Sequence, residues 1–404
     1  MAYGTEHPGH LLNVPASRMS AFPDDPGHFV DWLAQEPRWR PDGGWTPQSF
    51  VPRRLYRDYL SSLLEPSRED GPGRLVVVHE EVVDLAETPG GVEAVSRNGD
   101  RHSGDAAVLA TGNESPVLPP ARWRHGFWAS RSGFDIPSDA TVAIIGTGLS
   151  MVDSVVSLLD SGHSGRIVAL SRRGLMPQPH GAMNEPLPLD PAEIPFGCSV
   201  SRLAGWLREK IRQGGGDWRA TIDGLRPHTQ RLWRELPPAE RQRFLRHART
   251  WWDVHRHRMA PEVRARIDAA RASGQLTVLA GRLAGMDADR DGVRLRFVAR
   301  GTATEQAMQA HHVIECRGQN ADIGTTRNPL LGNLLRRGVV RPGPFRLCID
   351  VAADCAAIDA RGTPSRRVFA VGPITVGAFW EMVAVPDIRQ QAKTLATRLA
   401  GPTG

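Results

Sequence analysis

A glycine loop that follows an apolar strand is the clearest chemical signal in the sequence. The loop consists of Gly146, Thr147, Gly148, Leu149 and Ser150. Gly146 permits a tight turn out of the strand, and Gly148 lets the backbone approach a pyrophosphate that the first amides of the next helix can bind. The hydroxyl of Ser150 can add another donor. We therefore predict dinucleotide binding here, against the alternative of a plain strand-to-helix turn.

One position departs from the usual dinucleotide fingerprint. Its third glycine, which lets the helix pack closely on the strand, is replaced by Met151. This side chain must widen the gap between helix and strand or point elsewhere.

The end of the following strand indicates which dinucleotide binds. Ser171, Arg172 and Arg173 stand where NAD sites usually carry an acidic residue for the ribose hydroxyls. NADP sites instead use arginine to hold the extra phosphate, so these residues favour NADPH. The alternative is that the two arginines are solvated loop residues.

Periodic patterns define the elements that position this loop. We predict helices near His28–Ala34, over Pro52–Leu64 and Leu149–Leu159, and throughout Ser201–Ala272. We predict strands at Leu75–Val78 continuing into Val82–Leu85, and at Gly91–Ser96, Ala106–Ala110, Thr141–Ile145, Arg166–Leu170, Leu276–Leu279, Gly292–Ala299 and His312–Cys316.

Two of these strand sets share one spacing. Leu75 and Leu276 are as far apart in sequence as Gly91 and Gly292, and each set ends in an apolar strand followed by a glycine turn. We interpret this as a duplicated half, the alternative being chance similarity between strand patterns. Only the second set is preceded by a β-α-β unit, Thr141–Gly174, so the pattern predicts a matching unit ahead of Met1.

Bulk composition narrows the class of protein. The chain has 404 residues, 40% hydrophobic and 23% charged, as expected for a globular protein with two domains. The net charge of +6 is spread along the chain and comes mostly from arginine, so we predict no nucleic-acid partner. No apolar run approaches the roughly 20 residues that span a bilayer, and no signal peptide opens the chain, which favours a cytoplasmic protein without a membrane partner.

Other groups of residues give weaker indications of a catalytic or metal site. The four cysteines form no C-x-x-C pair, and no G-x-S-x-G elbow is present. His255 and His257 lie two apart on a predicted helix and so face different directions, and we predict no metal site. The Trp- and Arg-rich helices between the strand sets are interpreted as amphipathic core, with a substrate lid or partner surface as the alternative.

With these residues in hand, the chain resembles bacterial FAD/NAD(P)-binding oxidoreductases, which are related to flavin monooxygenases and N-hydroxylases. The resemblance runs through almost the whole chain. It rests on Ala2–Thr5, His10–Pro15, Phe50–Arg53, Ala110–Gly112, Gly146–Ser150, Trp252–Pro261, Ala370–Pro373 and Ala384–Arg389.

The resemblance implies an α/β fold with two Rossmann-like dinucleotide-binding domains, each three-layered with a parallel sheet and a β-meander. FAD would lie on a discontinuous domain formed by residues 1–120 and 321–404. NADPH would lie on residues 121–320, which carry a helical insertion at about 200–272.

The resemblance also implies flavin contacts. Thr111-Gly112 and Gly372-Pro373 would approach the flavin nucleotide, and the stretch that contains Asn13 would lie near the flavin ring. Without the family, Ala110-Thr111-Gly112 would be interpreted as a strand-ending turn.

The family normally opens with a strand, a glycine loop and a helix that bind the FAD pyrophosphate. A stretch like Gly-Val-Ala-Tyr-Gly-Thr follows, whereas this sequence begins at Met1, where the family has Val. Because a GTG codon encodes Val or starts translation, we hypothesise that the start was placed too late and that the first domain is incomplete. In-frame upstream codons without a glycine loop would refute this. Arg317 is another departure, since the family has Thr there.

The implied function is a flavoenzyme in which NADPH reduces FAD and the reduced flavin reacts with oxygen or another acceptor. The specific expectation is a monooxygenase acting on a small amine or other organic substrate. The cofactor supplies the difficult chemistry, so no catalytic acid or base is predicted. The alternative is a truncated or degenerate relative that binds NADP(H) alone or is inactive. The sequence does not indicate which oligomeric state the protein has.

Overall fold

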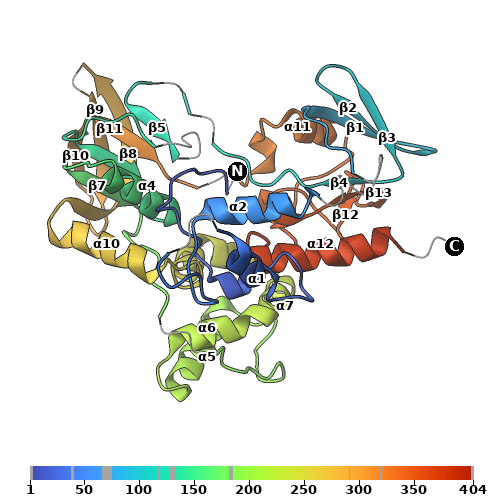
Figure 1. The fold of residues 1–404 in the computed structure, drawn as a ribbon, viewed down its shortest axis with the longest axis horizontal. Helices are drawn as coiled ribbons and strands as arrows, with labels where there is room; N and C mark the ends of the chain where they lie inside the picture. The colour runs from blue at the N-terminus through green and yellow to red at the C-terminus, as the bar shows by residue number, and fades with distance from the viewer. Residues whose placement is uncertain are drawn as a thin grey trace.

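The computed structural model describes residues 3–37, 41–65, 75–116, 118–119, 121–127, 133–181, 185–290, 292–318 and 320–401. Two strand-rich units lie side by side above a group of helices, and the N-terminal segment runs between them (Figure 1). Within the described residues, no helix combines the length and apolarity needed to cross a membrane.

The larger unit is built on a seven-stranded sheet. Its strands, in spatial order, are β10 (Glu305–Ala310), β9 (Gly292–Ala299), β8 (Leu276–Asp289), β7 (Ile167–Ser171), β6 (Val142–Ile145), β11 (His312–Glu315) and β5 (Arg124–Gly126). The strands from β8 to β5 are parallel, while β8, β9 and β10 form an antiparallel meander.

The central strand β6 is buried on both faces because all four of its side chains are apolar. Val142 and Ile144 pack with α4 (Leu149–Asp160) and α10 (Pro261–Ala272), whereas Ala143 and Ile145 pack against the meander. Side chains alternate across a strand, so a continuous apolar run suits a sheet covered on two sides. The result is three layers, of helices, sheet and meander.

The smaller unit repeats this plan with fewer strands. β1 (Val82–Thr88), β2 (Gly91–Ser96) and β3 (Arg101–Gly104) form an antiparallel meander, and β4 (Ala107–Leu109) pairs in parallel with β13 (Pro364–Ala370). β12 (Ala356–Ile358) lies antiparallel to β13. α11 (Pro329–Arg336) packs with residues of both meander and parallel strands in one core.

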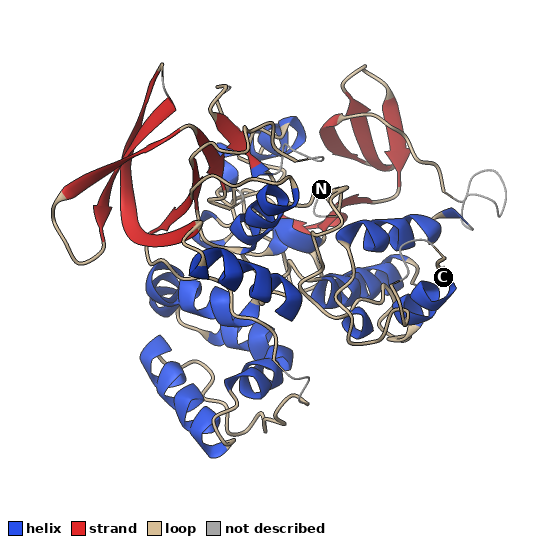
Figure 2. Cartoon of the chain, turned by 60° about the vertical axis from the view of Figure 1, so that its left-hand side comes forward, coloured by secondary structure: helices blue, strands red, loops and turns tan. Residues whose placement is uncertain are grey.

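Helices fill the space between and below the two units (Figure 2). α1 (His28–Gln35) and α2 (Arg53–Ser62) share a core of aromatic and aliphatic residues with the N-terminal loop, and α12 (Val385–Leu399) closes the chain. The insertion between β7 and β8 comprises α5 (Val200–Gln213), α6 (Trp218–Leu225), α7 (Thr229–Glu235), α8 (Pro238–Arg243), a π-helical turn (Phe244–Ala248), α9 (Arg249–Arg256) and α10.

The duplicated strand sets correspond in detail. A Cβ added to Gly91 would lie 2.3 Å from the carbonyl oxygen of Gly104, and one added to Gly292 would lie 2.3 Å from that of Ala310. Each glycine is thus the first residue of the second strand of a meander. It lies directly against the last residue of the third strand. The predicted match between the two strand sets holds at Gly91 and Gly292 and at the parallel strands β4 and β11, but not at Leu75, which lies outside any strand whereas Leu276 begins β8.

Three expectations were wrong or incomplete. Leu75–Val78 forms no strand, and Val76, Val77 and Val78 are exposed and pair with no strand among the described residues. The insertion is not one continuous helical run, because it breaks at residues 214–217 and 257–260. The sequence analysis also predicted no strand at β3, β5, β10, β12 or β13, most of which are short or rich in polar residues, and no helix at α11 or α12.

Candidate functional site

The predicted glycine loop lies between β6 and α4, at the carboxyl edge of the parallel sheet. Gly146 has φ +114°, and an added Cβ would lie 2.2 Å from the carbonyl oxygen of Cys316. Gly148 is exposed, and nothing lies within 4 Å of the position a Cβ would take. The first glycine is therefore required by the protein's own packing, and the second leaves open space in front of a helix.

This open space fits the anionic part of a dinucleotide. Gly148 is the N-cap of α4 and offers no side-chain cap, and in the described part of the chain the amides of Leu149 and Ser150 make no hydrogen bond. First-turn amides and the positive helix end attract phosphate. Met151, at the position of the third glycine, is fully buried in the core beside Val142, so it points away from the loop.

Two of the predicted residues brace the loop. The hydroxyl of Thr147 donates to the carbonyl of Leu175 at 2.5 Å and lies 2.8 Å from that of Ser171. The hydroxyl oxygen of Ser171 also accepts from the amide of Gly174 at 3.0 Å. The Ser171 hydroxyl, expected at a cofactor phosphate, is thus already engaged in holding β6 to the end of β7.

The neighbouring arginines differ in their surroundings. Arg172 is exposed, whereas Arg173 donates through Nη2 to the carbonyl of His247 at 2.9 Å. That carbonyl belongs to the π-helical turn, and the guanidinium lies 5.9 Å from the ring centre of Trp251. Arg173 therefore joins the glycine-loop edge to the insertion, and Arg172 projects a charge into solvent beside it.

A second group of predicted residues meets at the ends of β4 and β13. The amide of Val371 donates to the carbonyl of Leu109 at 3.1 Å, so the turns that carry Thr111-Gly112 and Gly372-Pro373 lie at one edge. Gly112 and Gly372 have φ values of +68° and +76°, and no atom lies within 4 Å of a Cβ on either.

These turns can accommodate part of a nucleotide. Thr111 and Gly112 are exposed, but the amide of Gly372 already donates to Oε1 of Gln391 at 2.7 Å. Only the short turn Gly372–Thr375 follows β13, so this edge has no helix start comparable to α4 among the described residues.

Asn13 lies elsewhere, in the wall of a cavity of about 80 Å³ between the N-terminal loop, the insertion and the start of α12. The cavity is lined by Tyr3, Asn13, Val14, Pro15, Arg18, Met19, His180, Asp223, Arg226, Arg256, His257, Arg258, Val383, Ala384 and Val385. None of the other predicted site residues lines it. The predicted site is therefore distributed over the glycine loop, the β4–β13 edge and this cavity.

Ion pairs fix the charged wall of the cavity. Arg258 pairs with Asp223 through two hydrogen bonds of 3.1 Å, and its side chain is only 3% exposed. Arg226 donates to Asp387 at 2.9 Å. These pairs connect α6, the segment after α9 and the first turn of α12, so the insertion is locked to the C-terminal helix.

Glu381 lies outside the cavity lining and binds residues of α9. It is buried with φ +66°, a left-handed conformation that is costly for a side chain other than glycine. Its carboxylate accepts from Nε1 of Trp252 and, at 3.1 Å, from Nε of Arg256. The two bonds hold α9 against the loop before α12.

The cavity histidines are held neutral. Burial lowers the pKa of His180 to about 4, and it also lowers the pKa of His257 to about 4. His180 donates from Nε2 to the carbonyl of Asn13 at 3.0 Å, which fixes its tautomer. His255, in α9, donates to the carbonyl of Trp251, whereas His257 follows the end of that helix and lines the cavity.

No cluster of three potential metal ligands is found in the described part of the chain. Arg317 donates to both carboxylate oxygens of Glu315, at 2.7 and 3.0 Å, so it serves a local ion pair where the family has Thr. Met1 and Ala2, which open the N-terminal family stretch, lie outside the described residues.

Comparisons with known proteins identify the class. Residues 1–114 match a family model described as FAD-NAD(P)-binding, which agrees with the resemblance found in the sequence. Curated protein sequences give no match.

Solved structures match over nearly the whole chain. The cadaverine monooxygenase DfoA of Erwinia amylovora is 12% identical with a TM-score of 0.63, covering 99% of this chain and 86% of that one. An ornithine N-hydroxylase of Kutzneria sp. 744 is 13% identical with a TM-score of 0.60, covering 99% and 89%. The ornithine hydroxylase of Pseudomonas aeruginosa is 15% identical with a TM-score of 0.60, covering 98% and 88%. The chain therefore has the mixed α/β, Rossmann-type fold of FAD- and NAD(P)-binding flavoproteins.

The sequence analysis missed most cavity residues as site residues. Arg256, His257 and Arg258 fall inside the family stretch Trp252–Pro261, which marked the region without giving its role. Arg18, Asp223 and Arg226 carried no motif, because only the folded chain brings the N-terminal loop against α6.

Proposed function

We propose that the chain is an FAD-dependent NADPH oxidoreductase that acts on a small organic substrate, with monooxygenation as the specific reaction. The observation that carries the proposal is the start of α4 at Gly148, which faces open space at the edge of a parallel sheet. A helix start that faces open space is a typical binding site for the pyrophosphate of a dinucleotide.

NADPH is assigned to this cradle. The amides of Leu149 and Ser150 would hold the pyrophosphate, and Gly148 would let it approach. Arg172, exposed at the end of β7, would pair with the extra phosphate of NADPH. Thr147 and Ser171 keep the loop in shape rather than contacting the cofactor.

FAD is assigned to the other edge. Thr111-Gly112 and Gly372-Pro373 would border the flavin nucleotide, and Asn13, whose carbonyl is fixed by His180, would lie beside the ring. When bound, the flavin accepts hydride from NADPH and passes electrons to oxygen. The protein's own residues bind, orient and shield the reactants, and the lined cavity at Asn13 supplies a place for the substrate.

The monooxygenase assignment rests on the fold. Solved structures of an ornithine N-hydroxylase and a cadaverine monooxygenase resemble nearly the whole of this chain in fold, which supports the proposal. The domain division into residues 1–120 with 321–404 and residues 121–320 is part of the proposal.

The test is NADPH-dependent oxygen uptake by purified protein after incubation with FAD. Flavin absorbance should remain with the protein after desalting, and oxygen uptake should require NADPH. Protein that retains no flavin and consumes no oxygen would favour the second candidate, a relative that binds NADP(H) alone. The observation behind that candidate is that, in the part of the chain that the structure describes, only the short turn Gly372–Thr375 begins at the β4–β13 edge.

A further inference from the structure

The cavity beside Asn13 contains more hydrogen-bond donors than its own acceptors can use. Arg258 is saturated, since it donates to both oxygens of Asp223 at 3.1 Å and to the carbonyl of His255 at 2.9 Å. Its position over the ring of Trp218, at 5.1 Å, holds it further. Arg258 and Asp223 therefore form a fixed floor with little capacity left for a ligand.

Three other arginines keep free donors. Arg226 makes one hydrogen bond, from Nη2 to Asp387, and Arg256 makes one, from Nε to Glu381. Arg18 lies 3.7 Å from the nearest oxygen of Asp223, which is an ion-pair distance but too long for a hydrogen bond. Among the described residues, no other acceptor bonds to these three guanidinium groups.

The charged groups of the cavity and their ion-pair partners have a net charge of plus one. The cavity lining contains the guanidinium groups of Arg18, Arg226, Arg256 and Arg258 and the carboxylate of Asp223. The carboxylates of Asp387 and Glu381 lie outside the lining and pair with Arg226 and Arg256, which leaves one positive charge unbalanced. His180 and His257 add no charge near neutral pH because burial lowers their pKa values to about 4. The nearby carboxylate of Asp253 is paired with Arg249. The first turn of α12 also borders the cavity, and its positive end acts in the same direction.

A second, larger pocket adjoins the cavity. It measures about 450 Å³ and shares Arg18, Asp223 and Arg226 with the cavity. Its remaining wall is mainly apolar, formed by Pro186, Leu187, Pro188, Leu189, Gly224, Pro227 and His228. Arg18, Asp223 and Arg226 therefore separate the cavity from a mainly apolar pocket, which we call the outer pocket.

The apolar wall is held in place by α6. The amide of Leu187 donates to the carbonyl of Ala220 at 2.9 Å. A Cβ added to Gly224 would lie 2.0 Å from the carbonyl oxygen of Leu187, so only glycine allows this approach. The pocket is therefore a built feature of the insertion.

We propose that this junction is the substrate site and that it takes an organic monocarboxylate. The carboxylate accepts hydrogen bonds from Arg18 and Arg226, and the apolar part of the molecule lies against Pro186–Leu189. A surplus of one positive charge matches a monoanion rather than a phosphate monoester, and the planar fork of arginine matches a carboxylate. The inference rests on the proposed function, because it names the substrate class of the same enzyme.

The test uses calorimetric binding to the FAD-incubated full chain, with hexanoate as the probe. Hexanamide, hexylamine and hexyl phosphate serve as matched probes of the same length. We expect hexanoate to bind most tightly, and Arg18→Gln and Arg226→Gln each to weaken it about ten-fold or more. Arg202→Gln, on the exposed face of α5, is the matched control and should leave binding unchanged.

A further variant guards against loss of folding, since Arg226 also holds α12. Pro188→Glu changes an exposed residue of the outer pocket, so it should weaken hexanoate binding by repulsion while the melting temperature stays unchanged. Unweakened binding in this folded variant would overturn the assignment of the outer pocket.

Several outcomes would overturn the inference as a whole. Tighter binding of hexylamine would assign the site to an ammonium group at Asp223, and tighter binding of hexyl phosphate would assign it to a dianion. Hexanoate binding that FAD abolishes would assign the cavity to the flavin itself. Failure of NADPH-dependent flavin reduction, with arginine-dependent hexanoate binding intact, would instead count against the proposed function alone.

Discussion

Gly146 and the carbonyl of Cys316 approach each other so closely that a Cβ on the glycine would lie 2.2 Å from the carbonyl oxygen. The contact joins the ends of the neighbouring parallel strands β6 and β11. Two residues further on, Gly148 faces open space. One motif thus contains a glycine that serves the fold and a glycine that is free to serve a ligand.

Substitution of Gly146 should affect the stability of the protein, whereas substitution of Gly148 should affect NADPH binding. Gly146→Ala meets backbone atoms and a φ of +114°, so we expect a loss of unfolding free energy of about 2 kcal/mol or more. Gly148→Leu should change the unfolding free energy by less than about 1 kcal/mol, yet weaken NADPH binding at least about ten-fold. Urea denaturation and NADPH titration measure the two effects. Equal losses of stability in both variants would contradict this division.

Arg172 should control the choice between NADPH and NADH. It is exposed beside the loop, whereas Arg173 already donates to the carbonyl of His247. We expect Arg172→Ala to weaken NADPH binding about ten-fold and to leave NADH binding within about two-fold. Arg166→Ala, which changes an exposed arginine just before the start of β7, is the control. An equal effect of Arg172→Ala on both nucleotides would remove this arginine from the phosphate site.

Stability should fall as the solution becomes acidic. Burial lowers the pKa of His10 from 6.5 to about 4, so between these values the unfolded chain binds a proton that the folded chain does not. Folding therefore loses up to roughly 1.4 kcal/mol per pH unit for this histidine as pH falls through that window. His180 and His257 act in the same direction.

The contribution of His10 can be isolated. Its ring contacts Thr5 at 2.7 Å and Ser157 at 2.8 Å, so it connects the N-terminal loop to α4. His10→Gln should make the decline of stability between pH 6.5 and pH 4 shallower, as measured by urea denaturation at several pH values. His247→Gln, with an exposed side chain, should leave the slope unchanged. An unchanged slope in His10→Gln would show that this imidazole does not titrate as described.

A buried ion pair should fix the N-terminal loop to the larger unit. Nη1 of Arg53 lies 2.7 Å from Oδ2 of Asp153, with side-chain exposures of 12% and 8%, and Nε of Arg53 donates to the carbonyl of Leu11. Arg53→Met leaves a buried carboxylate unpaired and should cost about 3–5 kcal/mol in chemical denaturation. The double variant Arg53→Met with Asp153→Leu should recover much of that loss. A single variant as stable as the wild type would show that the pair is not needed.

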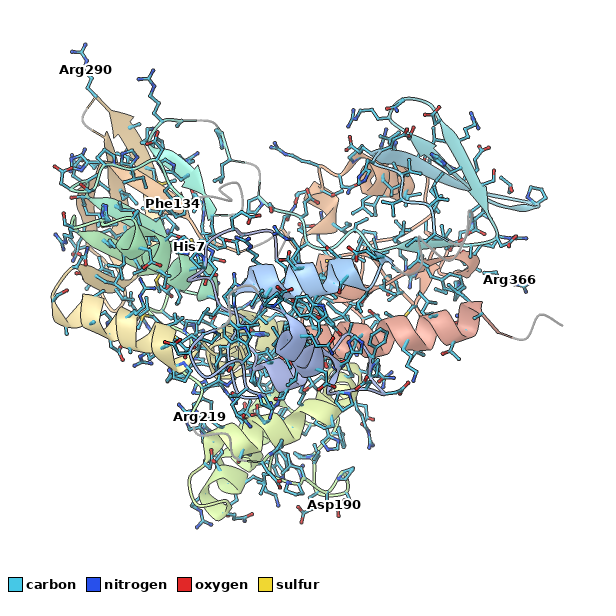
Figure 3. All side chains as sticks on the ribbon, viewed as in Figure 1. His7, Phe134, Asp190, Arg219, Arg290 and Arg366 are labelled. Carbon is cyan, nitrogen blue, oxygen red and sulfur yellow. The ribbon has the colours of Figure 1, made fainter. Side chains whose placement is uncertain are left out.

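Local pattern predicted much of the fold. The apolar run of β6, the helical spacing of α4 and the glycine starts of β2 and β9 each follow from nearby residues, and these elements lie where the sequence placed them. The strand predicted at Leu75–Val78 was wrong. β-branched residues favour a strand only where a partner strand exists, and these valines are exposed. The side chain of His7 lies beside α4 (Figure 3), and its Nε2 is 3.6 Å from Oδ2 of Asp160 in that helix, so the N-terminal loop reaches the larger unit.

The candidate site was less predictable, because it depends on contacts between distant segments. The cavity unites the N-terminal loop with α6, α9 and α12, and nothing near Arg18 in the sequence indicates its approach to Asp223. Ser171 was expected at a cofactor phosphate, but its hydroxyl bonds to Thr147 and Gly174 instead. Family stretches marked the region around Arg256 without revealing that it lines a cavity.

The most direct measurement is anaerobic addition of NADPH to the FAD-incubated protein while flavin absorbance is followed. The account predicts that NADPH bleaches the flavin at lower concentration than NADH does, and that Gly148→Leu loses this response while still retaining flavin. Bleaching by NADPH that is unchanged in Gly148→Leu would contradict the assignment of NADPH to the start of α4.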